Sequence, residues 1–223
     1  LAVALICIFL FANGIPAIRQ IGFVKFITGD IWRPGNELFG IFPMIIGSIY
    51  VTAGAIIFGV PIGILTSVFM AMYCPKKIYK PLKAATELLA GIPSVVYGWV
   101  GLTVLVPAIK TVFDRQVGHS ILAAGLVLAV MIFPTITSVA ADALHSVPKE
   151  CRMAAYGLGS TRWQTIYRIV VPAAAPGIIS GVILGLARAF GEALAVAMVI
   201  GQTTALPTSI FSTTKTLTTE IAA

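Results

Sequence analysis

The sequence predicts an all-α protein that crosses a membrane several times, because it is apolar, poor in charge and divided into long uncharged stretches. Of the 223 residues, 58% are hydrophobic and only 10% are charged, and the mean hydropathy is +1.00. A soluble domain carries about a quarter charged residues because its surface faces water. The composition therefore excludes an ordinary cytosolic enzyme, and five apolar stretches are candidates for membrane helices.

The first stretch runs from Leu1 to Ile18, and the charged Arg19 follows it. It has the length of the apolar region of a signal peptide, but it lacks a basic leader and a clear cleavage site. We therefore interpret it as a truncated first membrane helix.

The second helix lies within Leu38 to Pro75, an uncharged run that is too long for one straight span. Proline is tolerated in the first turn of a helix but disturbs its interior. We therefore expect this helix to begin near Pro43, to kink at Pro61 and to end at Cys74.

Three further spans follow. The third occupies most of Leu88 to Ile109, the fourth most of Gly118 to Ala141, and the fifth runs from about Pro172 to Gly201. The last stretch, Thr203 to Ala223, is rich in threonine and too polar to cross. Because five spans leave the end of the chain outside, a sixth span is expected beyond it.

Basic residues predict the orientation, because lysine and arginine are retained on the cytoplasmic side. They gather in the loops after the second and fourth spans, which are therefore placed inside: Lys76, Lys77, Lys80 and Lys83, and then Lys149, Arg152, Arg162 and Arg168. The formal net charge of +7 is thus largely a topology signal. No nucleic-acid partner is needed to explain it.

Two charges lie inside the fifth span, Arg188 and Glu192. Arg188 is sixteen residues beyond Pro172, about 24 Å along a helix, so it does not easily reach the inner surface. A charge at that depth costs about 2.5 to 3.5 kcal/mol and should face a partner or a water-filled path. The spacing of four residues places both side chains on one helical face, as a structural ion pair or as a polar lining that attracts an oxyanion without trapping it.

Proline and glycine interrupt the start of the third span, in the run from Glu87 to Gly98. Pro93 removes a backbone donor and loosens the helix, which lets Ser94 face a cavity. A simple kink explains the same pattern equally well.

The inside loop, residues 142–171, is too basic to span a membrane, yet it carries helix-forming alanines and spaced aromatic residues. It predicts a short helix, a break at Gly157 and Gly159, and a second helix. Such a segment either lies on the membrane surface or forms a docking surface for a cytoplasmic subunit.

The sequence contains no motif for catalysis or nucleotide binding, since GxxxxGK[ST], HExxH and GxSxG are all absent. Cys7, Cys74 and Cys151 fit neither a disulfide framework nor a zinc site. The residues therefore indicate no cofactor bound by this chain itself. Any ATP that drives it, with its Mg²⁺, must be bound by another chain.

The inside loop resembles the EAA signature of ABC importer permeases. The resemblance is carried by Ala154, Ala155 and Gly159, followed after nine residues by Ile169 and then by Pro172. It implies that residues 142–171 contain the segment that docks on the ATPase.

One departure from the signature is clear, because Met153 stands where the signature has its glutamate. We therefore carry no glutamate role over to this position. The resemblance implies that the remaining motif positions and two neighbours make the ATPase contacts: Ala154, Ala155, Gly159, Arg162 and Trp163.

Other runs narrow the resemblance to the permeases of phosphate importers: Glu87 to Gly98, Gly159 to Thr165 and Pro176 to Gly185. Of the two phosphate permease types, Arg188 to Gly201 followed by Leu206 to Phe211 resembles the PstC type rather than the PstA type. The likeness covers nearly the whole chain after the first span.

The resemblance implies a MetI-like permease core, with residues 1–223 as one domain of which five spans are visible. It also implies three partners: a second, PstA-like permease, a PstB-like ATPase dimer and an external PstS-like phosphate-binding protein. The chain itself is expected to lie in the cytoplasmic (inner) membrane. Alternating access would move phosphate past Arg188 and Glu192, with Ser94 as a further candidate.

The sequence thus predicts the permease subunit of an ATP-driven phosphate importer. Another oxyanion, such as sulfate or molybdate, stays an alternative because one arginine does not distinguish tetrahedral anions. An ion-coupled transporter or channel without an ATPase is an alternative of a different class, and a purely structural scaffold is a third.

Overall fold

The computed structural model of the chain describes residues 1–222. One short antiparallel pair joins β1 (Trp32–Arg33) to β2 (Leu38–Phe39), and the rest of the regular structure is helical. The α-helices are α1 Ala2–Ile21, α2 Phe23–Thr28, α3 Phe42–Val68, α4 Lys76–Gly91, α5 Ser94–Val100, α6 Val106–Val112, α7 Ile121–Ser146, α8 Lys149–Gly157, α9 Arg162–Thr165, α10 Val171–Gly191, α11 Leu194–Ile200 and α12 Leu217–Ala222. Wider π-helical turns extend α3, α5 and α9, at Phe69–Tyr73, Gly101–Leu105 and Ile166–Val170.

Within the described residues, five helical stretches are long and apolar enough to cross a membrane, which confirms the predicted number: Ala2–Ile21, Phe42–Tyr73, Ser94–Val112, Ile121–Ser146 and Arg162–Gly191. Their bounds differ from the prediction at the inner loop. The fourth continues to Ser146, and the fifth begins at Arg162 because α9 leads through its π-helical turn into α10 without interruption.

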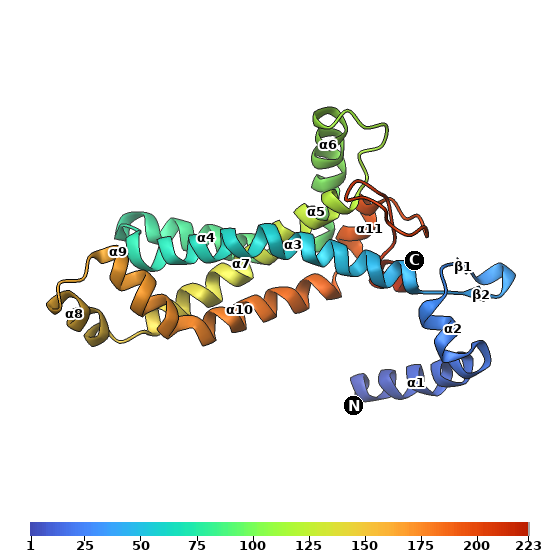
Figure 1. Cartoon of the computed structure of the whole chain (residues 1–223), viewed down its shortest axis with the longest axis horizontal. Helices are drawn as coiled ribbons and strands as arrows, with labels where there is room; N and C mark the ends of the chain where they lie inside the picture. Colours follow the sequence, from blue (N-terminus) through green and yellow to red (C-terminus); the bar gives the residue numbers. More distant parts are fainter. Residues whose placement is uncertain (223) are drawn as a thin grey trace.

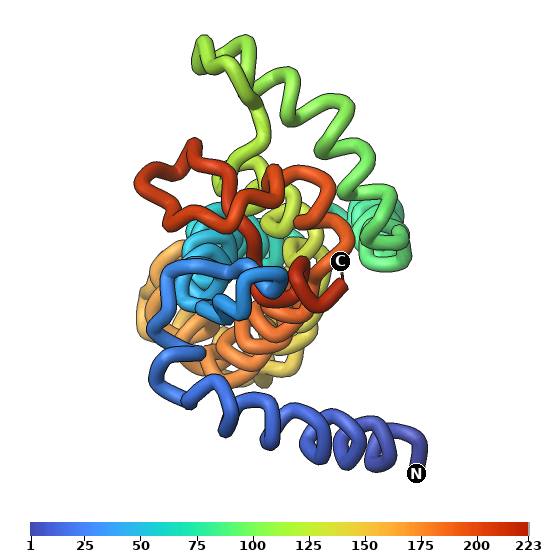
Figure 2. Tube along the Cα trace, turned by 90° about the vertical axis from the view of Figure 1, so that its right-hand side faces the viewer, coloured from blue at the N-terminus to red at the C-terminus, as the bar shows by residue number. Residues whose placement is uncertain are grey.

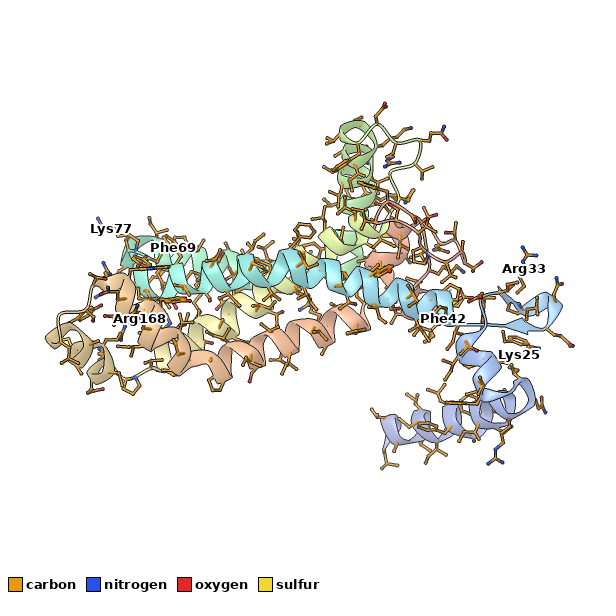
Figure 3. The ribbon with its side chains drawn as sticks, in the orientation of Figure 1. Lys25, Arg33, Phe42, Phe69, Lys77 and Arg168 are labelled. Carbon is orange, nitrogen blue, oxygen red and sulfur yellow. The ribbon has the colours of Figure 1, made fainter. Side chains whose placement is uncertain are left out.

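α3, α7 and α10 run side by side along the length of the molecule (Figure 1). α8 and α9 lie at one end, together with Lys77 and Arg168 (Figure 3). The basic residues predict that this end faces the cytoplasm, and we call it the inner end. The opposite end, where α3 begins at Phe42, is the outer end.

α7 is the centre of this bundle, and its Ile136 is fully buried. A Cβ atom added to Gly63 of α3 would lie 3.0 Å from Ile136, and one added to Gly185 of α10 would lie 2.8 Å from it. Glycine therefore lets both neighbouring helices close onto the same side chain.

α3 begins and ends where predicted, and the kink expected at Pro61 stays a prediction. Pro43 stands in the first turn, Cys74 ends the helical stretch, and the helix continues through Pro61.

The third span is interrupted as predicted, since α4 ends at Gly91 and α5 begins only at Ser94. In a continuous helix, residue 93 would donate its amide hydrogen to the Leu89 carbonyl, but proline has none. The Tyr97 hydroxyl donates to that carbonyl instead, at 2.7 Å. α5 and α6 then project from the side of the bundle (Figures 1 and 2).

α1 lies apart from the bundle (Figure 2), and none of its residues is buried. Its apolar side chains, including Phe9 at 67% exposure, are compatible with lipid or with another membrane subunit as their surroundings.

The segment after α11 covers the outer end. Thr203 donates from its hydroxyl to the Thr213 carbonyl at 2.7 Å, and α12 packs against α3 and α11. The predicted threonine-rich stretch is therefore an ordered cap; Ala223, its last residue, lies outside the described part of the chain.

Candidate functional site

The fifth span breaks at Glu192, so the prediction of one helix from Pro172 to Gly201 is wrong. α10 ends at Gly191, and Glu192 has φ −81° and ψ 122°, which is extended backbone. α11 begins at Leu194. Consequently Arg188 and Glu192 do not share a helical face, and the i, i+4 argument does not apply to them.

Side-chain contacts stabilise this break. Oε1 of Glu192 accepts a hydrogen bond of 3.1 Å from the Ala195 amide, one of the amides at the start of α11 that lack a helical partner. The Glu192 carbonyl accepts a bond of 2.9 Å from the Thr218 hydroxyl. The Ala195 amide and the Glu192 carbonyl therefore find partners inside the protein, as buried backbone groups need at membrane depth.

Arg188 is half-buried in the last turn of α10. A cation there is favoured because the unpaired carbonyls of a helix C-terminus carry partial negative charge. Within the described residues the ion pairs are Lys83–Glu87 and Lys215–Glu220, and neither involves Arg188 or Glu192. The structural ion pair considered from the sequence is therefore not formed in this conformation.

The break in the third span and the break in the fifth are joined by packing between α5 and α11. A Cβ atom on Gly98 would lie 2.8 Å from the Cα atom of Ala195, so glycine is required for this contact. Tyr97 stands next to Gly98 at this contact. Sequence reasoning did not single out Tyr97, although it stands in the proline-containing run.

Ser94 is half-buried at the first position of α5. A groove of about 580 Å³ is lined by the residues just before it, among them Glu87, Gly91 and Pro93. Within the described residues Glu192 bonds to Ala195 and Thr218, and Ser94 makes no hydrogen bond to Glu192. The place of Ser94 on the anion path stays a prediction.

Glu192 also borders a small cavity at the outer end, which sequence reasoning missed. Besides Glu192, its polar lining comes from Ser48 and Thr52 of α3 and from Thr216 and Thr218 of the threonine-rich segment. The volume is about 10 Å³. The threonine content of the last stretch was the available signal, but it was used only to exclude a membrane span.

The inner end carries the second part of the site, the turn between α8 and α9. Gly159 has φ +81°, a conformation that favours glycine. Thr161 then caps α9: its hydroxyl accepts from the Gln164 amide at 3.3 Å, while Oε1 of Gln164 accepts from the Thr161 amide at 2.9 Å. The predicted helix, glycine break and second helix are confirmed.

The residues predicted to contact an ATPase fall into two groups. Ala155 is buried and fixes α8, whereas Ala154 and Gly159 are exposed. Trp163 is 60% exposed and stacks on Tyr167, with ring centroids 6.3 Å apart and planes 10° apart. An exposed aromatic pair of this kind is unusual on a solvated surface and suits a protein contact.

The Arg162 side chain contacts the end of the α3 stretch and is not part of this aromatic pair. Its Nη2 donates to the Met72 carbonyl at 3.1 Å, and its guanidinium lies 5.3 Å from the centre of the Tyr73 ring. Arg162 therefore joins the turn to the inner end of α3. A direct contact between Arg162 and an ATPase stays a prediction.

Several relatives align with most of this chain. A probable ABC transporter permease protein, YqgH of Bacillus subtilis, is 48% identical over 97% of this chain and 71% of its own length. The phosphate transport system permease protein PstC of Mesorhizobium japonicum is 37% identical over 97% of this chain and 72% of its own length. A probable PstC of Methanocaldococcus jannaschii is 32% identical over 96% and 74%.

The fold is shared with solved structures of the MetNI methionine ABC transporter in inward-facing conformations. One matches 71% of this chain and 70% of its own with a TM-score of 0.53 at 21% identity, and another matches 75% and 76% with a TM-score of 0.52 at 22% identity. At this identity the likeness concerns the fold alone, and it confirms the predicted permease architecture.

The membrane bundle, its broken fifth span and its ordered inner turn define a multi-pass permease subunit of the inner membrane. Residues 59–222 match the family described as binding-protein-dependent transport system inner membrane component. The chain belongs to that family.

Proposed function

We propose that this chain is the permease subunit of an ATP-driven importer that moves inorganic phosphate across the inner membrane by alternating access. The observation that carries the proposal is the break in the fifth span, which leaves Arg188 and Glu192 close in sequence but unpaired with each other in the described residues. Relatives named as phosphate transport permeases support the choice of substrate.

The chemistry of Arg188 suits an oxyanion. A guanidinium presents a planar fork of N–H donors that matches two oxygens of a tetrahedral anion. Since neither ion pair in the described chain uses Arg188, its fork is available to a passing anion. The carboxylate of Glu192, four residues further along the chain, would oppose tight retention, so that the anion is held briefly and released.

The inner turn supports the proposed ATP-driven mechanism. We assign the exposed face of Trp163 and Tyr167, with Ala154 and Gly159 beside it, as the surface that fits a PstB-like ATPase dimer. ATP and Mg²⁺ would be held by that dimer. The intact importer would also contain a PstA-like permease and, at the outer end, a PstS-like phosphate-binding protein.

The test is phosphate uptake by the complete complex reconstituted in vesicles, with ATP on the side of the ATPase. Arg188→Gln should abolish uptake and leave assembly intact, because only the anion contact is removed. Arg33→Gln, which removes an exposed arginine on the outer hairpin, is the matched control and should transport normally. Normal uptake by Arg188→Gln would contradict the proposal and favour a structural role.

Substrate choice and energy source are tested separately. Excess unlabelled phosphate should suppress uptake of labelled phosphate more strongly than sulfate or molybdate does. If sulfate or molybdate competes better, the chain carries another oxyanion. Phosphate uptake without any ATPase subunit would instead support the ion-coupled alternative.

A further inference from the structure

Hydroxyl groups gather beside Glu192 at the outer end of the bundle. Thr52 of α3, Thr216 and Thr219 are 4%, 4% and 2% exposed. Ser48 of α3 and Thr218 of α12 complete the set, which we call the hydroxyl cluster. Buried hydroxyls are costly in an apolar membrane protein unless they have partners or a polar passage to serve.

Hydrogen bonds within the hydroxyl cluster join the outer segment to the bundle. The Leu217 amide donates to the Ser48 hydroxyl at 3.1 Å, and the Thr218 hydroxyl donates to the Glu192 carbonyl at 2.9 Å. Neither link involves a charged side chain. Such bonds exchange readily with bonds to water or to an anion, because each contributes only about 0.5 to 1.5 kcal/mol net.

Thr52 differs from the other members of the cluster. A serine or threonine in a helix commonly donates back to the preceding turn, as Ser48 does to the Met44 carbonyl at 2.9 Å. No such bond is recorded for the Thr52 hydroxyl among the described residues, and Thr52 lines the cavity beside Glu192. Its hydroxyl is therefore available to whatever enters that cavity.

The cavity is closed to an anion in this conformation. Its volume of about 10 Å³ matches a single water-sized sphere. Phosphate would enter only if the outer segment moved away from α3, which requires the Leu217–Ser48 and Thr218–Glu192 bonds to open.

We propose that the hydroxyl cluster is the closed outer gate of the anion path, and that Thr52 and Thr218 donate to the anion when the gate opens. The proposal rests on the proposed function, since it places the gate next to Glu192 on the path past Arg188. Neutral hydroxyls bind an oxyanion without adding charge, so they guide the anion and do not retain it.

The first experiment locks the gate with a disulfide in the complete complex. Ser48→Cys and Leu217→Cys are combined after Cys7, Cys74 and Cys151 have been replaced by serine. The Ser48 hydroxyl and the Leu217 amide are 3.1 Å apart, so the two residues are neighbours, and formation of the disulfide is verified before uptake is measured. Oxidation should abolish phosphate uptake, and a reductant should restore it.

A matched control links α3 to α7 at a glycine contact that does not line the cavity of the hydroxyl cluster. Cβ atoms on Gly54 and Gly125 would make only ordinary contacts, at 3.4 Å or more, with the facing helix. The pair Gly54→Cys and Gly125→Cys should therefore form a disulfide and leave uptake unchanged. Full uptake by the oxidised Ser48–Leu217 pair, with disulfide formation verified, would overturn the gate.

A second experiment does not depend on the double variant. Thr52→Val keeps the shape of the side chain and removes its hydroxyl, so uptake at saturating binding protein should fall while assembly stays normal; Thr52→Ser should restore uptake.

Thr216→Cys should react faster with an impermeant maleimide during ATP turnover than at rest. Equal reaction rates together with normal uptake by Thr52→Val would exclude the gate.

The two proposals fail in different ways. If Arg188→Gln abolishes uptake but the locked pair and Thr52→Val transport normally, the path is correct and the gate is wrong. If Arg188→Gln transports normally, the proposed function itself is wrong.

Discussion

The Trp32 indole donates a hydrogen bond of 2.7 Å from Nε1 to Oε1 of Glu220, although the two residues are 188 positions apart. The other carboxylate oxygen, Oε2, lies 2.5 Å from Nζ of Lys215. Glu220 thus ties the outer hairpin that follows α1 and α2 to the segment that covers the outer end.

Trp32→Phe should therefore destabilise the outer end. The substitution removes a hydrogen bond to a charged acceptor, which contributes about 1.5 to 3 kcal/mol. Thermal unfolding of the purified complex should show a lower midpoint, and the segment around Glu220 should exchange its amide hydrogens faster. Trp99→Phe is the control, because Trp99 is 59% exposed. Identical exchange in both variants would mean that the Trp32–Glu220 bond does not hold the cap.

Tyr97→Phe should loosen the break in the third span. Without the hydroxyl, the Leu89 carbonyl keeps only the 3.3 Å bond from the Ile92 amide and loses the donor that replaces the missing amide of Pro93; such a hydrogen bond contributes about 0.5 to 1.5 kcal/mol. We expect a lower unfolding midpoint and slower phosphate uptake, since Tyr97 stands next to Gly98, where α5 packs against α11 just after the break at Glu192.

Tyr50→Phe provides the comparison, because Tyr50 is 50% exposed on α3. The two variants are measured by thermal unfolding and by uptake in the reconstituted complex. If both behave alike, the Tyr97–Leu89 bond has no role in holding the break.

Trp163→Ala should uncouple the permease from its ATPase without unfolding it. Trp163 is 60% exposed and stacks only on Tyr167 among the recorded aromatic pairs of the described chain, so few intramolecular contacts are lost. Copurification of the ATPase should decrease, and phosphate-stimulated ATP hydrolysis should fall. Trp99→Ala, with nearly the same exposure, should leave both unchanged. Full copurification of the ATPase with Trp163→Ala would remove this residue from the docking surface.

Gly185→Ala should destabilise the bundle. The new Cβ atom would lie 2.8 Å from Cγ1 of the fully buried Ile136, and overpacking of this kind costs about 1 to 3 kcal/mol. Gly14→Ala in α1 meets no atom within 4 Å and should be neutral or stabilising. Thermal unfolding of the two variants tests this contrast, and equal midpoints would contradict it.

The membrane spans could be predicted from the sequence because apolar length and proline position are local properties. Pro43, Pro93 and Cys74 mark the ends of helical stretches in the structure where the sequence placed them. The break at Glu192 could not be predicted in the same way. Its backbone is satisfied by Thr218, and that contact depends on how a distant segment folds back.

The hydroxyl cluster was missed for a related reason. Ser48 and the amide of Leu217 are 169 residues apart, and no spacing rule links them. Similarly, Arg162 reads as one more basic residue of the inside loop, whereas its contact with Met72 becomes visible only when the inner end of α3 is in place.

Ile136 has a mechanical consequence. Because it packs against Gly63 of α3 and Gly185 of α10 at once, sliding of either helix along α7 would push its backbone into a fully buried side chain. We therefore expect the three helices to move as one rigid unit. Changes of conformation would then be concentrated at its two ends, at the α8–α9 turn and at the break between α10 and α11.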